Sequence, residues 1–332
     1  MTLPLIRLQP WYPGQLGVYG SDVPRGLRWE PTGIVMYVDN VSADANDAHD
    51  GTNPEAPMLT IQAAVTKLIA HQTAQGVSLS GSVIVVAGTG YTENVVIPNT
   101  APKYCTLMGG GPTAFKPTWA ATTATAPCLD IRAEGWVIEG FEFDCPASAA
   151  GVRVVDTLPV AADTAYKAVI RDCVFDGLWS GLYGIEFYGA PHRVHVLNNW
   201  FLELNAAGAA YGIIVTDSTH SNPYECAIVG NRFTENDNHV GSLGSIRAWN
   251  VSLFKGNIFE EGVINPTTLY LDLRGGTRGY NIVTGNWFGG AYTNAGGYYA
   301  NAATPNSCWV GNFAEPTPAT VGDNGLTVAV PA

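Results

Sequence analysis

Charge is scarce in this chain, and basic residues are scarcer than acidic ones. Of its 332 residues, 13% are charged, with 16 Lys and Arg against 28 Asp and Glu, so the formal net charge is −12. No cluster of basic residues occurs along the sequence. Because nucleic-acid binding requires a basic surface that neutralises phosphates, we expect no nucleic-acid partner.

Long apolar runs are missing as well. No window approaches about 18 uninterrupted apolar residues, the length that a membrane-spanning helix needs. The N-terminus also lacks the charged, apolar and small-residue order of a secretory signal. We therefore expect a soluble protein that the Sec pathway does not export and that has no membrane partner.

Cysteine is infrequent, and its spacing does not suggest pairing. The six cysteines form no C-x-x-C pair and lie mostly beside apolar residues that are typical of strands. We expect buried free thiols rather than disulfides or metal ligands. The six are Cys105, Cys128, Cys145, Cys173, Cys226 and Cys308.

What the sequence does contain is a repeated phrase. Between residues 137 and 313 it repeats an apolar, β-branched run, then Gly-Asn or Asn-Asn in the later copies, one variable residue and Phe. Successive copies are 32, 26, 32, 26, 29 and 25 residues apart, so one supersecondary unit with a loop of variable length is repeated. The closing residues are Phe143, Phe175, Phe201, Phe233, Phe259, Phe288 and Phe313.

Each copy is typical of a strand, a sharp bend and a second strand. Gly and Asn tolerate a left-handed backbone conformation, so their column marks the place where every coil turns the same corner. The Phe column would then stack inside a solenoid at one strand spacing, about 4.8 Å, per coil. The asparagines would form a ladder of hydrogen bonds between coils: Asn199, Asn231, Asn257, Asn286 and Asn312.

A second column of strands falls between the copies of the phrase. One alternating segment occurs in each coil, at residues 151–155, 184–188, 212–216, 245–249 and 269–273. A β-sandwich would instead show turn signals every 8–12 residues or so and would not repeat the phrase at one register. The sequence therefore predicts an all-β fold, a right-handed parallel β-helix over residues 36–313.

Residues 1–35 are predicted to form an extended arm. Their prolines leave no helical or strand period. Exposed Trp and Tyr side chains are costly, so we expect the arm to pack on a partner; folding back on its own solenoid and an ordinary tail are the alternatives. The aromatic residues of the arm are Trp11, Tyr12, Tyr19 and Trp29.

One helix is predicted between the arm and the coils. Thr60 stands in N-cap position ahead of apolar residues at helical spacing, which indicates a helix near residues 59–70. Its place suits a cap on the open end of the solenoid. Residues 112–127, rich in Ala and Thr, are predicted to be a lateral loop, and residues 314–332 a C-terminal tail in which 326–330 could form a last strand.

The segment around this helix resembles a known superfamily. Tyr37-Val38-Asp39, Asp50-Gly51-Thr52-Asn53-Pro54, Pro57 and Thr60-Ile61-Gln62-Ala63-Ala64 look like the opening segment of pectin-lyase-like right-handed parallel β-helix proteins. With the repeats, the resemblance covers residues 36–313. It implies the fold but not one activity, since this fold hosts lyases, hydrolases, epimerases and non-enzymatic virion proteins.

Candidate chemistry is sparse. The loop after residue 38 offers oxygen ligands that could hold Ca²⁺ but do not match an EF-hand, and Asx-turns explain the same composition without a metal. No other cofactor is suggested. The histidines are dispersed, without the pairing that suggests Zn²⁺ or a nucleophile triad. The calcium candidates are Asp39, Asp44, Asp47 and Asp50.

Carboxylates near the bends could line a groove for a glycan. The polygalacturonase motifs Asn-Thr-Asp, Asp-Asp and Gly-His-Gly are absent. A glycoside hydrolase needs two carboxyl groups that face one sugar, and the weak catalytic candidates for that role are Asp217, Glu235 and Asp237. Arg153, Glu186 and Arg247 occupy outward positions of the second column, which more simply indicates ion pairs between coils.

The arm and its junction with the solenoid resemble virion proteins of tailed bacteriophages. The residues that carry this are Leu-Ile-Arg-Leu-Gln-Pro-Trp-Tyr-Pro-Gly at 5–14 and Gly-Leu-Arg-Trp-Glu-Pro-Thr-Gly at 26–33. The resemblance implies a non-enzymatic capsid decoration or spike protein, a homotrimer that the arm anchors to a capsid or tail protein and that could bind glycans. It would be assembled in the host cytoplasm and located in the virion. The alternatives are an extracellular polysaccharide lyase or glycoside hydrolase, including a phage depolymerase, and a plain glycan-binding module.

Overall fold

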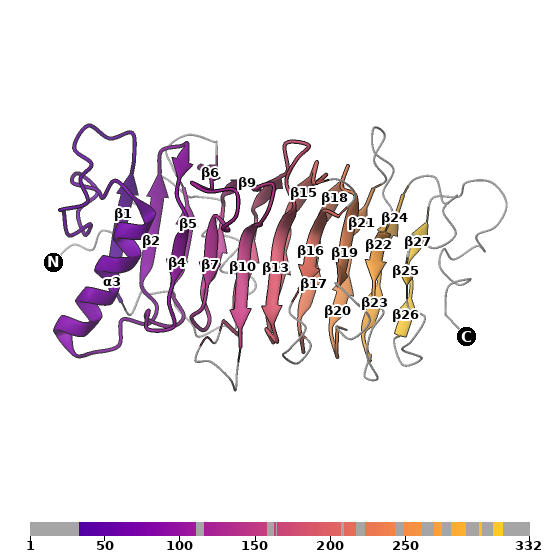
Figure 1. Ribbon diagram of the computed structural model, residues 1–332. Helices are drawn as coiled ribbons and strands as arrows, with labels where there is room; N and C mark the ends of the chain where they lie inside the picture. The colour runs from indigo at the N-terminus through magenta and orange to yellow at the C-terminus, as the bar shows by residue number, and fades with distance from the viewer. Residues whose placement is uncertain are drawn as a thin grey trace.

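The computed structural model describes residues 33–110, 116–157, 163, 165–206, 209–216, 223–242, 249–260, 269–273, 280–289, 299–300 and 308–314. Within them the chain winds into a solenoid of parallel strands that runs from the N-terminal to the C-terminal end of the molecule (Figure 1). The predicted parallel β-helix is thereby confirmed. Residues 1–32 of the predicted arm and residues 315–332 of the tail lie outside the described residues.

Sheet A has ten strands and holds the apolar run of each repeated phrase. Residues that follow its strands turn the corner with positive φ, including Asp172 at 52° and Gly230 at 67°. This is the left-handed conformation that the Gly and Asn column predicted. The strands are β1 (Val35–Asp39), β2 (Val83–Ala87), β5 (Thr106–Gly109), β8 (Val137–Glu139), β11 (Val169–Arg171), β14 (His195–Leu197), β17 (Ala227–Val229), β20 (Leu253–Lys255), β23 (Ile282–Thr284) and β26 (Cys308–Val310).

Sheet B has nine strands and follows the corner. Its strands are β3 (Tyr91–Thr92), β6 (Thr118–Ala120), β9 (Glu142–Asp144), β12 (Val174–Asp176), β15 (Trp200–Leu202), β18 (Arg232–Thr234), β21 (Ile258–Phe259), β24 (Trp287–Phe288) and β27 (Phe313–Ala314). The prediction of a lateral loop over 112–127 is wrong for β6. Trp119 of this strand is buried and pairs in register with Phe143, so the phenylalanine column begins with a tryptophan.

Sheet C has eight strands and corresponds to the second predicted column. Its strands are β4 (Val95–Ile97), β7 (Leu129–Ile131), β10 (Ala150–Asp156), β13 (Tyr183–Gly189), β16 (Tyr211–Val215), β19 (Asn238–Ser242), β22 (Leu269–Asp272) and β25 (Tyr299–Ala300). The prediction at residues 245–249 is wrong in register, because β19 pairs with both β16 and β22. Residues 243–248 lie outside the described residues, and Trp249 is buried in the core.

The asparagine column is a continuous ladder inside the solenoid. The backbone N–H and side-chain amide of Asn199 both donate to Oδ1 of Asn231, at 2.9 and 3.1 Å, and the same step repeats from Asn231 to Asn257, Asn286 and Asn312. Each amide also donates to a carbonyl of the preceding coil, as Asn231 does to Val196 at 2.9 Å. The ladder therefore satisfies buried backbone groups at a corner that strand pairing leaves open.

The phenylalanine column lies beside this ladder. Ring centroids of successive coils are 5.2 Å apart from Phe143 to Phe175, then 4.8, 4.7, 5.0 and 4.9 Å through Phe201, Phe233, Phe259 and Phe288. Their planes differ by at most 19°. All are fully buried, so the column forms part of the core along much of the solenoid. The side chain of Phe313 is outside the described residues.

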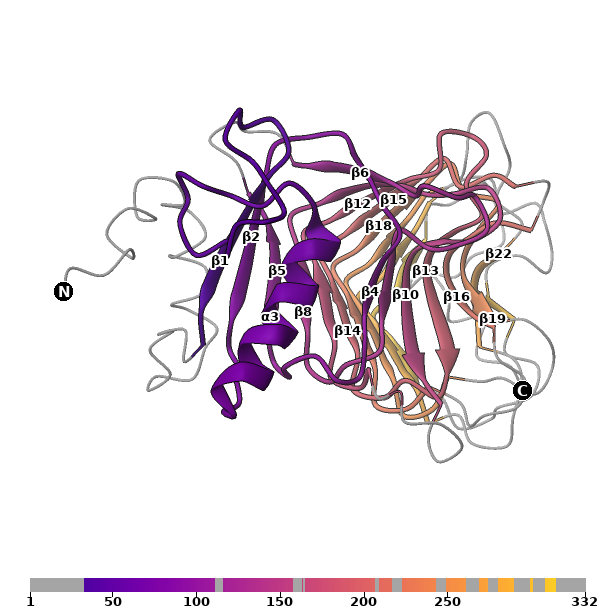
Figure 2. The same cartoon turned by 60° about the vertical axis from the view of Figure 1, so that its left-hand side comes forward.

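The helix α3 (Ile61–Gln75) packs against the N-terminal end of the solenoid (Figure 2). Thr60 is its N-cap, as predicted, and accepts a hydrogen bond from the N–H of Ala63. The carboxylate of Glu93 accepts from the next two N–H groups, of Ile61 and Gln62. The helix runs about one turn beyond the predicted end, because Gly76 at φ 64° provides the C-cap only there.

His239 of β19 is part of the aromatic core rather than of a polar site. It is fully buried against Phe233, Phe259 and Tyr270. Its Nε2 lies 2.8 Å from the carbonyl oxygen of Glu260, which can only accept, so Nε2 carries the hydrogen. Burial lowers the pKa of this imidazole from 6.5 to about 3.

We therefore expect acid to destabilise the fold through His239. Below pH 6.5 the unfolded chain binds a proton at this residue and the folded chain does not, so stability falls by about 1.4 kcal/mol per pH unit until pH approaches 3. The test is urea denaturation from pH 7 to 4 of the wild type and of His239→Phe. The variant should lose less stability over this range than the wild type. Equal slopes for both proteins would contradict the assignment.

Candidate functional site

The outward face of sheet C carries charged side chains in register on successive strands. One register position brings Val96, Asp130, Arg153, Glu186 and Ile214 side by side on successive strands. The next strand places Gly241 at this position. Arg247, which was predicted at this position, lies outside the described residues, and β19 begins seven residues earlier than predicted. The register position continues to Asp272 on β22 and Ala300 on β25.

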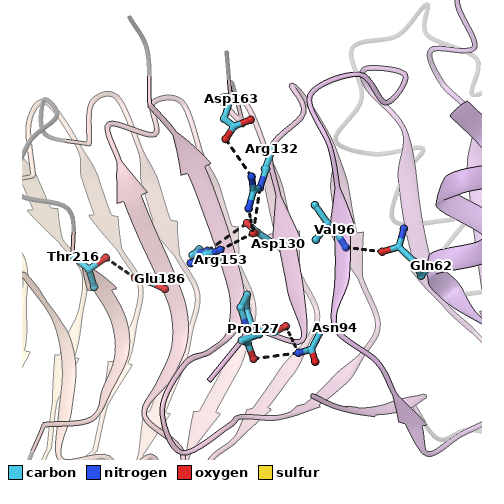
Figure 3. A network of polar contacts seen from close by, with 11 residues as sticks. Gln62, Asn94, Val96, Pro127, Asp130, Arg132, Arg153, Asp163, Glu186 and Thr216 are labelled. Atoms are coloured by element: carbon cyan, nitrogen blue, oxygen red, sulfur yellow. Dashed lines mark hydrogen bonds and ion pairs between the residues drawn. The ribbon is translucent and has the colours of Figure 1, made fainter. Parts of the chain in front are cut away.

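Asp130 is the anchor of this group (Figure 3). Its side chain is only 4% exposed. Oδ2 accepts from Arg153 at 2.6 Å and from Arg132 at 2.8 Å, and Arg132 reaches Asp163 at 3.5 Å. The predicted ion pair between coils therefore exists for Arg153, but its partner is Asp130 rather than Glu186.

The pairing with Asp130 keeps Arg153 protonated. Burial alone would lower the pKa of its guanidinium, but the hydrogen bonds and charge of Asp130 outweigh burial and raise that pKa. Arg153 is therefore a permanent cation at this face. A polysaccharide lyase that used it as a base would need it deprotonated.

Glu186 stands one coil further and has a different environment. Thr216 donates its hydroxyl to Oε1 of Glu186 at 2.5 Å. Burial raises the pKa of this carboxyl, and the hydrogen bond and the charge of Arg153 offset only part of that effect. Glu186 therefore holds a proton more readily than a glutamate in water does.

Tyrosines surround these charges. Tyr183 and Tyr211 are neighbours in register, with ring centroids 6.4 Å apart. Tyr188 is 37% exposed, and the Arg153 guanidinium lies 5.7 Å from its ring centroid. Aromatic surfaces next to hydrogen-bonding charged groups suit a ligand that is rich in hydroxyl groups and has apolar ring faces.

The geometry of Asp130 and Glu186 does not provide the general acid and the general base that hydrolysis of a glycosidic bond requires. Asp130 and Glu186 are two strands apart, roughly 9.6 Å along the sheet, near the separation of inverting glycosidases. However, Oδ2 of Asp130 accepts from both arginines, and Oδ1 lies 3.4 Å from Nε of Arg153. Asp130 is therefore placed to orient Arg153 and not to activate a water molecule.

The catalytic candidates drawn from the sequence lie elsewhere or outside the described residues. Asp217 is outside them. Glu235 has φ 56° and is at the bend that leaves sheet B, and Asp237 is buried close by. Burial raises the pKa of the neighbouring Glu203, and the charges of Asp176 and Glu235 raise it further. Glu203, Glu235 and Asp237 thus form an acidic corner between sheets B and C. This corner is separate from Asp130 and Glu186, which lie on strands of sheet C.

The Asp-rich loop is organised by local turns. Oδ1 of Asp39 and of Asp50 accepts from the N–H two residues later, at 3.0 Å in both cases. Asp47 accepts from the N–H groups of Leu59 and Thr60 just ahead of α3, at 2.9 and 2.8 Å. Over the described residues, no three His, Cys, Asp or Glu side chains gather in a way that could hold a metal ion. The turns account for the composition of this loop.

A second polar cluster occupies the corner between sheets C and A. The side chain of Glu134 is 4% exposed and binds the ammonium groups of Lys103 at 2.9 Å and Lys167 at 2.8 Å. The Tyr104 hydroxyl donates to the same carboxylate. Burial alone would raise the pKa of Glu134, but these hydrogen bonds lower it to about 2. One carboxylate pairs with both ammonium groups, so the cluster links three coils and carries a net positive charge.

The cysteines and large aromatics divide between core and surface. All six cysteines are free, and five are buried as predicted, but Cys308 at the C-terminal end of sheet A is exposed. Trp249 and Tyr270 are core residues, whereas Trp179 and Trp200 are partly exposed. Of the helices in the described part of the chain, none has the length and apolar character to cross a bilayer.

Comparisons with known proteins find likeness only among solved structures. No model of a protein family matches the sequence, and neither does any curated protein. A glycoside hydrolase matches at 16% identity over 69% of this chain and 38% of its own, with a TM-score of 0.40. Pectin methylesterase from carrot matches at 10% identity over 87% and 90%, with a TM-score of 0.41.

A third match is a tailspike protein mutant of the E. coli bacteriophage HK620 in complex with a pentasaccharide. It is 10% identical over 81% of this chain and 62% of the tailspike, with a TM-score of 0.41. The chain is therefore similar, at low identity, to a glycoside hydrolase, a pectin methylesterase and a phage tailspike. It spans 38% of the glycoside hydrolase and 62% of the tailspike.

Proposed function

We propose that this protein is a non-enzymatic structural component of a tailed-phage particle, a capsid decoration or spike protein, and that the outward face of sheet C binds a glycan. The pairing of Asp130 with two arginines carries the glycan proposal, because it supplies fixed hydrogen-bond donors and leaves no free base. The sequence of the arm, residues 1–35, supports attachment to a capsid or tail protein. In this proposal the β-helix assembles as a homotrimer and is displayed on the virion.

The second candidate is an extracellular polysaccharide hydrolase or lyase, including a phage depolymerase. One observation favours it: Glu186 has the raised pKa that a general acid requires. The opposing observations are the protonated Arg153 and the occupied Asp130 carboxylate. The two candidates differ in whether bound polysaccharide is cleaved.

We expect purified protein to bind a bacterial surface polysaccharide without releasing products. Tyr188→Ala should weaken binding about tenfold, the equivalent of about 1.4 kcal/mol, because the substitution removes an exposed ring from the proposed face. Trp200→Ala on sheet B is the matched control and should bind like the wild type. The measurement is titration calorimetry against lipopolysaccharide and capsule polysaccharides, with chromatography of the same samples for released oligosaccharides.

Glu186→Gln separates the two candidates. Gln can still accept the hydroxyl of Thr216 but cannot donate a proton as an acid, so a binding site should be affected only slightly. Released oligosaccharides that disappear in Glu186→Gln would replace the structural proposal with the hydrolase. If no polysaccharide in a panel from candidate hosts binds to the wild type, the glycan face is wrong.

A further inference from the structure

The outward face of sheet A is a long apolar surface. The outward positions of its short strands form two register columns in which apolar side chains predominate: one contains Val169, His195, Ala227 and Leu253, and the other Arg171, Leu197, Val229 and Lys255. At the C-terminal end, Ile282 is 48% exposed and Val310 56% exposed. Exposed apolar side chains that gather on one face of a folded protein are typical of a surface that a partner covers.

The apolar surface continues over the corner that precedes sheet A. Tyr104, Tyr224, Val251 and Tyr280 are all exposed there, each just before a strand of the sheet. Ten strands span about 43 Å, and the strands with this corner are roughly 18 Å wide, so the strip offers about 800 Å². This is the area per partner of a standard protein interface.

The strands of sheet A carry few charges, and the charges of the adjoining corner are in ion pairs, Lys103 and Lys167 with Glu134 and Arg193 with Glu225. From β2 to β26 the charged residues at outward positions are Glu139, Arg171 and Lys255, and the first two form an ion pair at 2.7 Å. Burial lowers the pKa of His195, which favours its neutral form. Sheet B, in contrast, carries Glu142, Asp144 and Asp176 in two neighbouring strands.

This distribution of charged and apolar residues indicates that the partner is a second copy of the chain. The whole chain has a formal charge of −12, so two copies repel each other across most of their surfaces. Sheet A is the face across which they can approach with apolar contact and without apposed carboxylates. We propose that sheet A, with its adjoining corner, is the surface through which copies of this chain pack side by side. The inference rests on the self-association within the proposed function and assigns it to one face.

The test is a pair of matched double variants of the full chain. Leu197→Glu with Val229→Glu places two adjacent carboxylates on sheet A, and Arg171 and Lys255, their outer neighbours in register, offset part of the repulsion between them. The control, Val174→Lys with Leu202→Lys on sheet B, has acidic neighbours in register, Glu142 and Asp176. Circular dichroism and thermal melting check that both variants fold.

Sedimentation gives the deciding result. We expect the wild type and the sheet B variant to sediment at a multiple of 35.2 kDa, and the sheet A variant at 35.2 kDa. A folded sheet A variant that stays assembled, or a wild type that is monomeric at micromolar concentration, overturns the inference. Polysaccharide binding by the same samples reports on sheet C separately, so a failure of one proposal can be told from a failure of the other.

Crosslinking identifies what covers the face. A photoreactive p-benzoylphenylalanine at position 197 should form bonds to sheet A of a second chain, which gel electrophoresis shows as multimers and mass spectrometry maps to peptides. Crosslinks confined to residues 1–32 of the same chain would show that the arm covers sheet A, and would overturn the proposal.

Discussion

Replacing Phe201 by Ala should destabilise the protein by about 3–5 kcal/mol, the largest effect that we expect from a single substitution. Phe201 is fully buried, and its ring stacks between those of Phe175 at 4.8 Å and Phe233 at 4.7 Å. Removing the ring opens a cavity in the middle of the column, where neighbouring coils are held by strand pairing on both sides and can collapse only partly. Urea denaturation followed by circular dichroism measures the loss.

The neighbouring Trp200 provides the control for this prediction. It lies on the same strand but faces outward and is partly exposed, so Trp200→Ala should cost less than half as much. Similar losses for the two variants would mean that burial in the column is not what makes Phe201 important.

Asn231→Val should have the second largest effect, a loss of about 3 kcal/mol or more. The substitution removes three buried hydrogen bonds: those that the backbone N–H and the side-chain amide of Asn199 donate to Oδ1 of Asn231, and the one that the carbonyl of Val196 accepts. The amide of Asn199 keeps its bond to Ile170. Each unsatisfied buried group costs about 1–3 kcal/mol, and Val cannot replace any of these bonds. The same denaturation experiment measures the change in the free energy of unfolding.

Asn53→Val tests whether the effect belongs to the ladder. Asn53 is exposed and makes one local bond, to the N–H of Glu55 at 3.0 Å, so its replacement should change stability by less than about 1 kcal/mol. An unchanged midpoint for Asn231→Val would refute the ladder as a stabilising element.

The fold was predictable because its repeated interactions are local in sequence. The strand, the left-handed corner, the ladder residue and the stacked ring occur within seven or eight residues, so the same short sequence pattern recurs in each coil. The helix start at Thr60 was predictable for the same reason, since a cap acts over three residues. Its end was less so, because the polar residues before Gly76 continue a helix without continuing an apolar face.

The candidate site was less predictable because its partners come from separate coils. Asp130 and Arg153 are 23 residues apart, and nothing in the segment Leu-Asp-Ile shows that β7 pairs with β10 at that register. The strand β19 was missed since it begins with Asn238 and His239, polar residues that are buried here because they bond to main-chain carbonyls.

The most direct measurement of the central claim is an experimental structure of the protein with a bound oligosaccharide from the polysaccharide that binds it. We predict an intact glycan chain across the outward face of sheet C, in contact with Tyr188, Arg153 and Glu186. A glycan bound at the acidic corner near Glu235, or one cleaved at Glu186, would contradict the proposal that sheet C binds its ligand without chemistry.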